Sequence, residues 1–406
     1  MELLSPAGNL EKLNYAYLYG ADAAYIGIRD FSLRARADNF SSEEWQEIRR
    51  VKGDRKLYGA LNIYFHKDSL DELERNIDYI ANYPFDAFIV SDLGAYSLLR
   101  KHFPNRRFHL STQANCINRE AAGMYHDMGF DRIILGRETS LDEIADIRAS
   151  VPDVELEVFV HGAMCLAYSG RCFLSRYLAD RSANEGDCTH SCRWNYRVLE
   201  EKQRPDEYFP IIEGDGFTTI LSSKDLCMFD YLPELKAAGI DSVKIEGRMK
   251  SLYYTAVVTR SYRKALDRLE KGDTSVDLDP YREELYKISR REFSTGFYLD
   301  PSDADRTTTI SYLRRYIFNG TVKECLPDGS FALDVRNQIR SADTIEFIGP
   351  DLLYIEDTGF TLFDENGCAV EKVDHGMTCS IRASVPIESG YIIRTSVPAS
   401  PAESLQ

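Results

Sequence analysis

Short apolar stretches rich in β-branched residues recur along the first part of the chain, and amphipathic segments of helical length separate most of them. This alternation is typical of repeated strand–helix units. Eight such units predict an α/β fold in which the strands close into a (β/α)8 TIM-like barrel. The predicted strands are residues 1–5, 23–28, 56–64, 87–92, 108–112, 132–137, 154–162 and 241–248.

The spacing of these predicted strands changes at one point. Successive strands begin about 20 to 35 residues apart up to the seventh, whereas the eighth follows only after roughly 90 residues. We therefore predict an insertion over about residues 162–230. Because the insertion follows the carboxyl end of a strand, it lies at the barrel face where enzymes of this architecture carry their chemistry.

The pattern changes again after the eighth predicted strand. Residues 251–272 have apolar side chains at helical spacing and end on a glycine suited to a C-cap, so they predict a helix. From about Thr308 apolar and polar residues alternate around a PDGS turn, which predicts a small all-β barrel. We therefore divide the chain into a barrel domain at 1–305 and a C-terminal β-barrel domain at 306–406.

Length and composition fit two globular domains. The chain has 406 residues, of which 44% are hydrophobic and 28% are charged. Its net charge of −16 argues against an unselective nucleic-acid binder, while basic segments such as residues 100–109 leave room for a local basic face. The N-terminus lacks the features of a signal peptide, and no apolar run is long enough to cross a membrane. We expect a cytoplasmic protein with no membrane partner.

Four of the nine cysteines crowd into the predicted insertion. Cys165, Cys172, Cys188 and Cys192 form the pattern C-x6-C-x15-C-x3-C, and Cys227 follows them. In a reducing compartment, clustered thiols are more often ligands or redox groups than disulfides. Zinc sites usually pair cysteines closely at both ends of the motif, whereas an iron–sulfur cubane tolerates wider spacing. Spacing alone favours an iron–sulfur cluster, with zinc or buried and redox-active cysteines as alternatives.

The same segment carries a family resemblance. EVFVHGAMCLAYSGRCFLS, residues 157–175, resembles the signature of the peptidase U32 family, the collagenase-like peptidases. ELLSPAGNLEKL, GDCTHSCRWNY, SSKDL, VKIEGRMKS and RRYIFNG extend the resemblance over almost the whole chain. Within this family the chain most resembles the bacterial RNA hydroxylation proteins.

The resemblance implies an activity and a cofactor. It implies 5-hydroxylation of the wobble uridine of tRNA with prephenate as co-substrate, while 5-hydroxylation of an rRNA cytidine and collagenase-like peptidase activity are the alternatives. Relatives carry a [4Fe-4S] cluster on cysteines of this region, which implies Cys165, Cys172 and Cys188 as ligands. Relatives differ in the origin of the fourth thiolate; we choose Cys192, with Cys227 as its rival.

Polar side chains follow several predicted strands and are placed to hold a substrate at the barrel mouth. A dicarboxylate such as prephenate matches the planar fork of arginine, for which Arg137 and Arg248 are best placed. The alternative is that these groups only close the barrel mouth through salt bridges. The predicted substrate-binding residues are Gln113, Arg137, Glu138, Lys244, Arg248 and, for stacking on an RNA base, Trp194.

Two residues are predicted to act in catalysis. His161 ends the seventh predicted strand shortly before the first clustered cysteine, and Glu246 lies near the end of the eighth. The chain contains neither HExxH nor GxSxG, which argues against a peptidase. We expect tRNA as the partner, or rRNA as the alternative, together with an electron donor or a related U32 protein.

Overall fold

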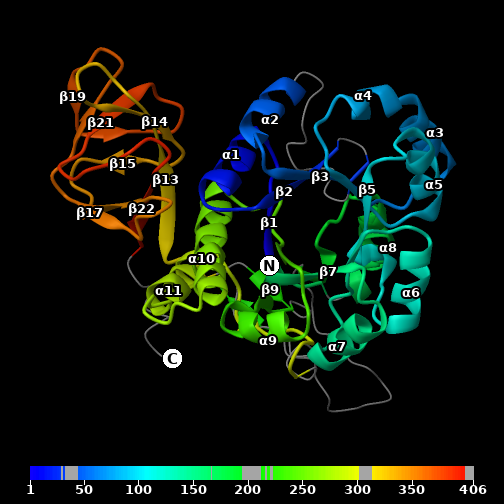
Figure 1. Cartoon of the computed structure of the whole chain (residues 1–406). Helices are drawn as coiled ribbons and strands as arrows, with labels where there is room; N and C mark the ends of the chain where they lie inside the picture. The colour runs from blue at the N-terminus through cyan, green and yellow to red at the C-terminus, as the bar shows by residue number, and fades with distance from the viewer. Residues whose placement is uncertain are drawn as a thin grey trace.

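The structure is a computed structural model that describes residues 1–28, 31–32, 44–165, 167–193, 212–214, 217–219, 223–300 and 313–397. It contains a barrel surrounded by helices and an all-β domain at the C-terminal end of the chain, coloured orange to red in Figure 1. None of the helices in these ranges has both the length and the apolar character that crossing a membrane requires.

Eight parallel strands form the barrel. Each of the first seven pairs with the next, and the last, β11, pairs with both β1 and β7, which closes the sheet. This closed parallel barrel confirms the predicted fold class. The strands are β1 (Glu2–Pro6), β2 (Ala23–Gly27), β3 (Lys56–Leu61), β4 (Ala87–Val90), β5 (Arg107–Leu110), β6 (Arg132–Ile134), β7 (Glu155–Ala163) and β11 (Ser242–Ile245).

Helices connect these strands and surround the barrel (Figure 1). The predicted helix at 251–272 is present: Ser251 caps its N-terminus, and Gly272 ends it in the left-handed conformation. The barrel helices are α1 (Leu10–Leu18), α2 (Trp45–Lys52), α3 (Lys67–Arg75), α4 (Ile77–Ala81), α5 (Leu93–His102), α6 (Arg119–Asp127), α7 (Leu141–Ser150), α9 (Leu232–Ala237), α10 (Leu252–Lys271) and α11 (Asp279–Lys287).

The chain between β7 and β11 forms the expected insertion. Its strand β10 runs antiparallel to the end of β7, so Cys227 lies opposite His161, and β12 (Phe293–Ser294) pairs with β10 in turn. Short turns before β10 carry the clustered cysteines. The elements of the insertion are η2 (Tyr168–Gly170), α8 (Leu174–Ala179), η3 (Ala183–Glu185), η4 (Ser191–Arg193), β8 (Ile212–Gly214), β9 (Phe217–Thr219), β10 (Asp225–Cys227) and η5 (Phe229–Tyr231).

A buried ion network crosses the barrel interior. Arg132 Nη1 lies 2.6 Å from Glu2 Oε1 and 2.8 Å from Glu157 Oε2. Lys244 Nζ lies 3.1 Å from Glu157 Oε1, and the side chain of Glu157 is 0% exposed. Charges removed from water in this way are tolerated only when each one is paired, so the network ties β1, β6, β7 and β11 to one another.

The C-terminal domain is built from antiparallel strands, as the alternating pattern predicts. Eight of them form one sheet in the order β17-β16-β22-β13-β14-β21-β18-β19, and β15 pairs with β20. Val322, Phe347, Ile381 and Ile393 lie in its separate apolar core. The strands are β13 (Tyr316–Cys325), β14 (Phe331–Val335), β15 (Ile339–Arg340), β16 (Ile345–Ile348), β17 (Ile355–Asp357), β18 (Thr361–Phe363), β19 (Ala369–Val370), β20 (Lys372–Val373), β21 (Cys379–Arg382) and β22 (Ile392–Ser396).

Buried polar contacts join this domain to the barrel helices. Arg394 on β22 pairs with Glu284 on α11 through two bonds of 2.8 and 2.9 Å, and both side chains are 0% exposed. Arg394 also donates to the Tyr253 hydroxyl on α10, and the Tyr19 hydroxyl donates to the carbonyl oxygen of Ile348. Since these groups satisfy one another only when the domains are docked, the interface fixes their relative position.

Candidate functional site

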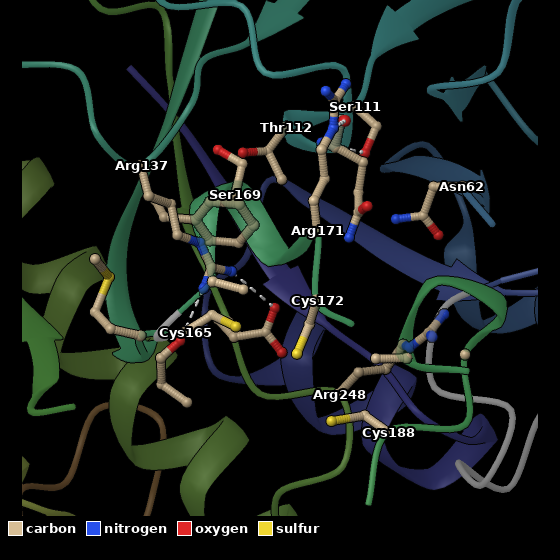
Figure 2. A pocket seen from close by; sticks show the side chains of 18 of the residues that line it. Asn62, Ser111, Thr112, Arg137, Cys165, Ser169, Arg171, Cys172, Cys188 and Arg248 are labelled. Carbon is tan, nitrogen blue, oxygen red and sulfur yellow. Dashed lines mark hydrogen bonds and ion pairs between the residues drawn. The ribbon is translucent and has the colours of Figure 1, made fainter. Parts of the chain in front are cut away.

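A cavity of about 450 Å³ opens at the carboxyl ends of the barrel strands. Residues at or just beyond the ends of several strands form its floor and walls, and the insertion covers one side. Figure 2 shows arginine, cysteine and small polar side chains from these segments around the same space. The position agrees with the catalytic face of TIM barrels.

The four clustered cysteines all line this cavity. Cys165 follows β7, Cys172 follows η2, and Cys188 and Cys192 come from the next turns of the insertion. Their thiols form no disulfide. Within the described residues, no group of three or more His, Cys, Asp or Glu side chains is close enough to hold a single metal ion.

Backbone hydrogen bonds fix the segments that carry these thiols. The N–H of Cys172 donates to Asn184 Oδ1 at 3.1 Å, and the N–H of His190 donates to Cys188 Sγ at 3.4 Å. Asn184 was not singled out in the sequence, because only the folded insertion brings it to Cys172.

Glu138 anchors the first cysteine loop instead of facing the cavity. Its carboxylate accepts hydrogen bonds from the N–H and from the hydroxyl of Ser169, both at 2.5 Å. Ser169 has φ +44°, a conformation that costs a residue with a side chain some energy and persists where the surroundings hold it. Glu138 is absent from the residues that line the cavity. Glu138, predicted to bind substrate, therefore contacts the η2 turn and not the cavity.

Arg137 and Glu246 meet at the cavity wall. Arg137 Nη2 lies 3.4 Å from Glu246 Oε2, and Arg137 Nη1 donates to the Ala163 carbonyl at 2.9 Å. The guanidinium also lies 4.1 Å from the centre of the Phe159 ring. These contacts hold the guanidinium over the ring, and Arg137 lines the cavity.

Arg248 and Lys244 bring further positive charge to the lining of the cavity. Arg248 is buried and donates from Nη1 to Ser32 Oγ at 3.1 Å. A Cβ at Gly27 would lie 1.9 Å from that nitrogen, so only glycine leaves room for the guanidinium. Lys244 Nζ lies 4.4 Å from the centre of the Tyr25 ring, and burial lowers the pKa of Lys244 although Glu157 opposes the shift.

Gln113 places a hydrogen-bond acceptor at the cavity. Its side chain is 6% exposed and lines the cavity, yet its Oε1 has no hydrogen-bond partner among the described residues. Arg171 Nε donates to the Gln113 backbone carbonyl at 3.0 Å and also lines the cavity. A buried polar atom left without a partner is costly and points to a ligand or water at this place. Arg171 was missed in the sequence, although it directly precedes Cys172.

His161 and Cys227 lie away from the cavity. The His161 ring packs against the rings of Tyr262 and Phe293, at 5.5 and 5.3 Å between centroids, and burial lowers its pKa to about 3. Cys227 Sγ lies 3.9 Å from the Tyr262 hydroxyl, and burial raises the pKa of this thiol to about 11. Neither residue lines the cavity, whereas Cys192 does. Trp194 lies outside the described residues.

Comparison with known proteins identifies the family. The description "Peptidase family U32" matches residues 8–308. The chain belongs to the U32 family. The family's C-terminal domain matches residues 314–394, so the matches cover both the barrel and the β domain of this U32 protein.

Relatives within the U32 family carry different names. "tRNA hydroxylation protein P" of Escherichia coli is 37% identical over 399 residues, which cover 86% of this chain and 86% of the relative. "23S rRNA 5-hydroxycytidine C2501 synthase" of E. coli is 37% identical, covering 67% of this chain and 40% of the relative. "Collagenase" of Porphyromonas gingivalis is 31% identical, covering 73% of each chain.

Proposed function

We propose that this protein is a tRNA-modifying enzyme that hydroxylates C5 of the wobble uridine, without molecular oxygen and with prephenate as co-substrate. The observation that carries the proposal is the cavity at the barrel mouth, where four thiols, three arginines and a lysine line one space. The relative named for tRNA hydroxylation supports this choice, because its similarity extends over most of both chains.

The four cysteines suit an iron–sulfur cluster. They come from separate turns of the insertion and all line one cavity. A cubane cluster needs thiolates spread around a bulky core. Cys165, Cys172, Cys188 and Cys192 would hold a [4Fe-4S] cluster, which would supply the electron transfer that ordinary side chains cannot provide.

The positive charges that line the cavity suit a small dicarboxylate. Arg137 and Arg248 have guanidinium groups held by neighbouring contacts, so they lose little freedom when they pair with a carboxylate. Lys244 adds a further cation to the cavity lining. In this proposal these groups bind the carboxylates of prephenate, and the free Oε1 of Gln113 accepts a hydrogen bond from its hydroxyl.

Two acidic residues hold other parts of the site in position. Glu246 pairs with Arg137 and keeps that guanidinium from turning away from the cavity. Glu138 holds the η2 turn and thereby the segment that leads to Cys172. Of the two residues predicted to act in catalysis, we give no catalytic role to His161, which packs among aromatic rings, whereas Glu246 lines the cavity and retains a role at the site.

The alternatives have less support from this chain. Hydroxylation of an rRNA cytidine would require the same cavity, but the rRNA relative aligns over only 40% of its own length. A peptidase of the collagenase type needs an activated nucleophile or a hydrolytic metal. The described residues hold no three-ligand metal group, and the cavity cysteines are assigned to the cluster.

The experiment that tests the proposal measures iron, acid-labile sulfide and zinc in anaerobically purified protein. We expect about four iron and four sulfide per chain, lost in Cys172→Ala and retained in Cys368→Ala, a matched control at an exposed cysteine of the β domain. Stoichiometric zinc, or full metal content in Cys172→Ala, would contradict the cluster.

The reaction itself is tested on RNA. Mass spectrometry of tRNA nucleosides from a deletion strain should show loss of 5-hydroxyuridine, restored by the wild-type gene and not by the Cys172→Ala gene. The same loss is expected in a strain that cannot make prephenate. If the modified nucleoside disappears from rRNA instead, the rRNA alternative replaces this proposal.

A further inference from the structure

Five exposed side chains of the insertion alternate between aromatic rings and arginines, and two of them, Arg171 and Phe173, line the cavity. Tyr168, Phe173 and Tyr177 are 53%, 78% and 82% exposed. Arg171 and Arg176 stand between them in the sequence and are also exposed. We call these five residues the rim patch.

The fold holds the rim patch in place. Phe173, Arg176 and Tyr177 are spaced by three and four residues at α8, so they share one side of the helix. On the opposite side the hydroxyl of Ser175 is bound to the hydroxyl and the N–H of Thr189, both at 3.0 Å. The rings are thus presented to solvent by a helix whose other face is anchored.

The segment that carries the patch has a positive net charge, although the chain as a whole is acidic. Residues 161–179 contain two arginines and no aspartate or glutamate, in a chain whose net charge is −16. Arg176 pairs with Asp180 at 3.3 Å, but both side chains are exposed, and exposed pairs of this kind contribute little. The Arg176 guanidinium can therefore turn to a phosphate at small cost.

Aromatic rings interleaved with arginines suit unpaired nucleotides. Every base has a face that stacks on an aromatic ring, and arginine pairs with the phosphates between bases. Phe173 also lines the cavity, so a base stacked on it lies beside whatever occupies the cavity. When one base is turned out of an RNA loop, the neighbouring bases lose their stacking partner. These bases can then stack on aromatic side chains of the protein.

We propose that the rim patch binds the unpaired nucleotides that flank the modified base, with the rings of Phe173, Tyr177 and Tyr168 stacking on bases and Arg176 pairing with a phosphate. This inference rests on the proposed function, because it takes RNA as the substrate. It adds the surface that receives the RNA loop and the residues that do so.

The test measures binding of a fluorescent anticodon stem-loop RNA to the full-length holoprotein by anisotropy. Phe173→Leu and Tyr177→Leu keep apolar area but remove the stacking face; each should weaken binding about tenfold. Arg176→Ala should weaken binding and lower its dependence on salt, whereas Arg176→Lys should keep that dependence. Tyr286→Leu is the matched control, since Tyr286 is an exposed tyrosine on α11. It should bind like the wild type.

The outcomes separate this inference from the proposed function. Unchanged RNA affinity in folded, iron-loaded Phe173→Leu and Tyr177→Leu variants would overturn the rim patch even if the tRNA loses its modification in the deletion strain. Ring-dependent binding of the RNA would support the patch even if another nucleoside proves to be the product. A change in association between copies of the chain, with RNA affinity unchanged, would assign the patch to a protein interface and overturn the inference.

Discussion

Glu138 and Ser169 lie 31 residues apart in the chain, yet the carboxylate of Glu138 accepts hydrogen bonds from both the N–H and the hydroxyl of Ser169. The pair joins the segment after β6 to the turn that precedes Cys172. It therefore links the rigid barrel to the loop that carries the proposed cluster ligands.

Glu138→Gln should loosen this loop. The glutamine side chain keeps one carbonyl oxygen that can accept a hydrogen bond from Ser169. Its NH2 group replaces the other acceptor oxygen and cannot accept the second bond, so about 1–3 kcal/mol of local stabilisation is lost. We expect faster proteolysis within residues 165–193 and faster loss of iron on exposure to a chelator. Asp142→Asn, at an exposed position on α7, is the control and should match the wild type. Equal iron loss from the two variants would refute the positioning role.

Cys192→Ala and Cys227→Ala should differ in how much iron they retain. Cys192 lines the cavity, whereas Cys227 lies beside Tyr262. Because burial raises the pKa of Cys227 to about 11, this thiol does not readily form the thiolate that binds a metal. We expect Cys192→Ala to lose the iron–sulfur absorption and most of its iron, and Cys227→Ala to retain both. The reverse result would make Cys227 the fourth ligand and require β10 to be placed differently.

Glu2→Gln should destabilise the barrel in a pH-dependent way. Burial raises the pKa of Glu2, but Arg132 and Lys56 outweigh it and lower the pKa to about 2. Since the folded pKa lies below the unfolded one, the carboxylate stabilises the protein fully above about pH 5, and this contribution fades as the pH falls toward 2. We expect the variant to lose about 1–3 kcal/mol at pH 7, because Glu157 still pairs with Arg132.

Unfolding curves of the wild type and of Glu2→Gln at pH 7, 5, 4 and 3 measure this effect. The difference in unfolding free energy should be constant between pH 7 and 5 and should shrink below pH 4.5. A difference that stays constant down to pH 3 would show that Glu2 acts without its charge.

Arg394→Met should uncouple the two domains. It removes the guanidinium that pairs with two buried carboxylates, Glu284 and Glu346, which costs about 3–5 kcal/mol. Thermal unfolding should separate into two transitions, the first for the β domain. Arg336→Ala is the matched control: Arg336 pairs with Glu11 across the same domains, but both side chains are partly exposed, so its removal should cost less than about 1 kcal/mol. A single unshifted transition in Arg394→Met would contradict the coupling.

The barrel could be predicted because its strands are buried, apolar and evenly spaced. Each one leaves a continuous run of residues such as AAYIG in β2, and the one long interval marks the insertion with its cysteines. Residues at or just after the carboxyl ends of strands also meet in a barrel, which is why Arg137, Lys244, Glu246 and Arg248 were found from the sequence and line one cavity.

The sequence by itself therefore determined the fold class, the place of the insertion and the residue types at the barrel mouth, because these depend on periodicity and order along the chain. The tertiary structure alone decided which way individual side chains face. His161 shows the reason: strand alternation would put it on the same face as Phe159, but β7 has an extra residue where its register against Lys244 and Ile245 shifts. That bulge turns His161 toward Tyr262 on α10 and away from the cavity, and bulges depend on packing between distant segments.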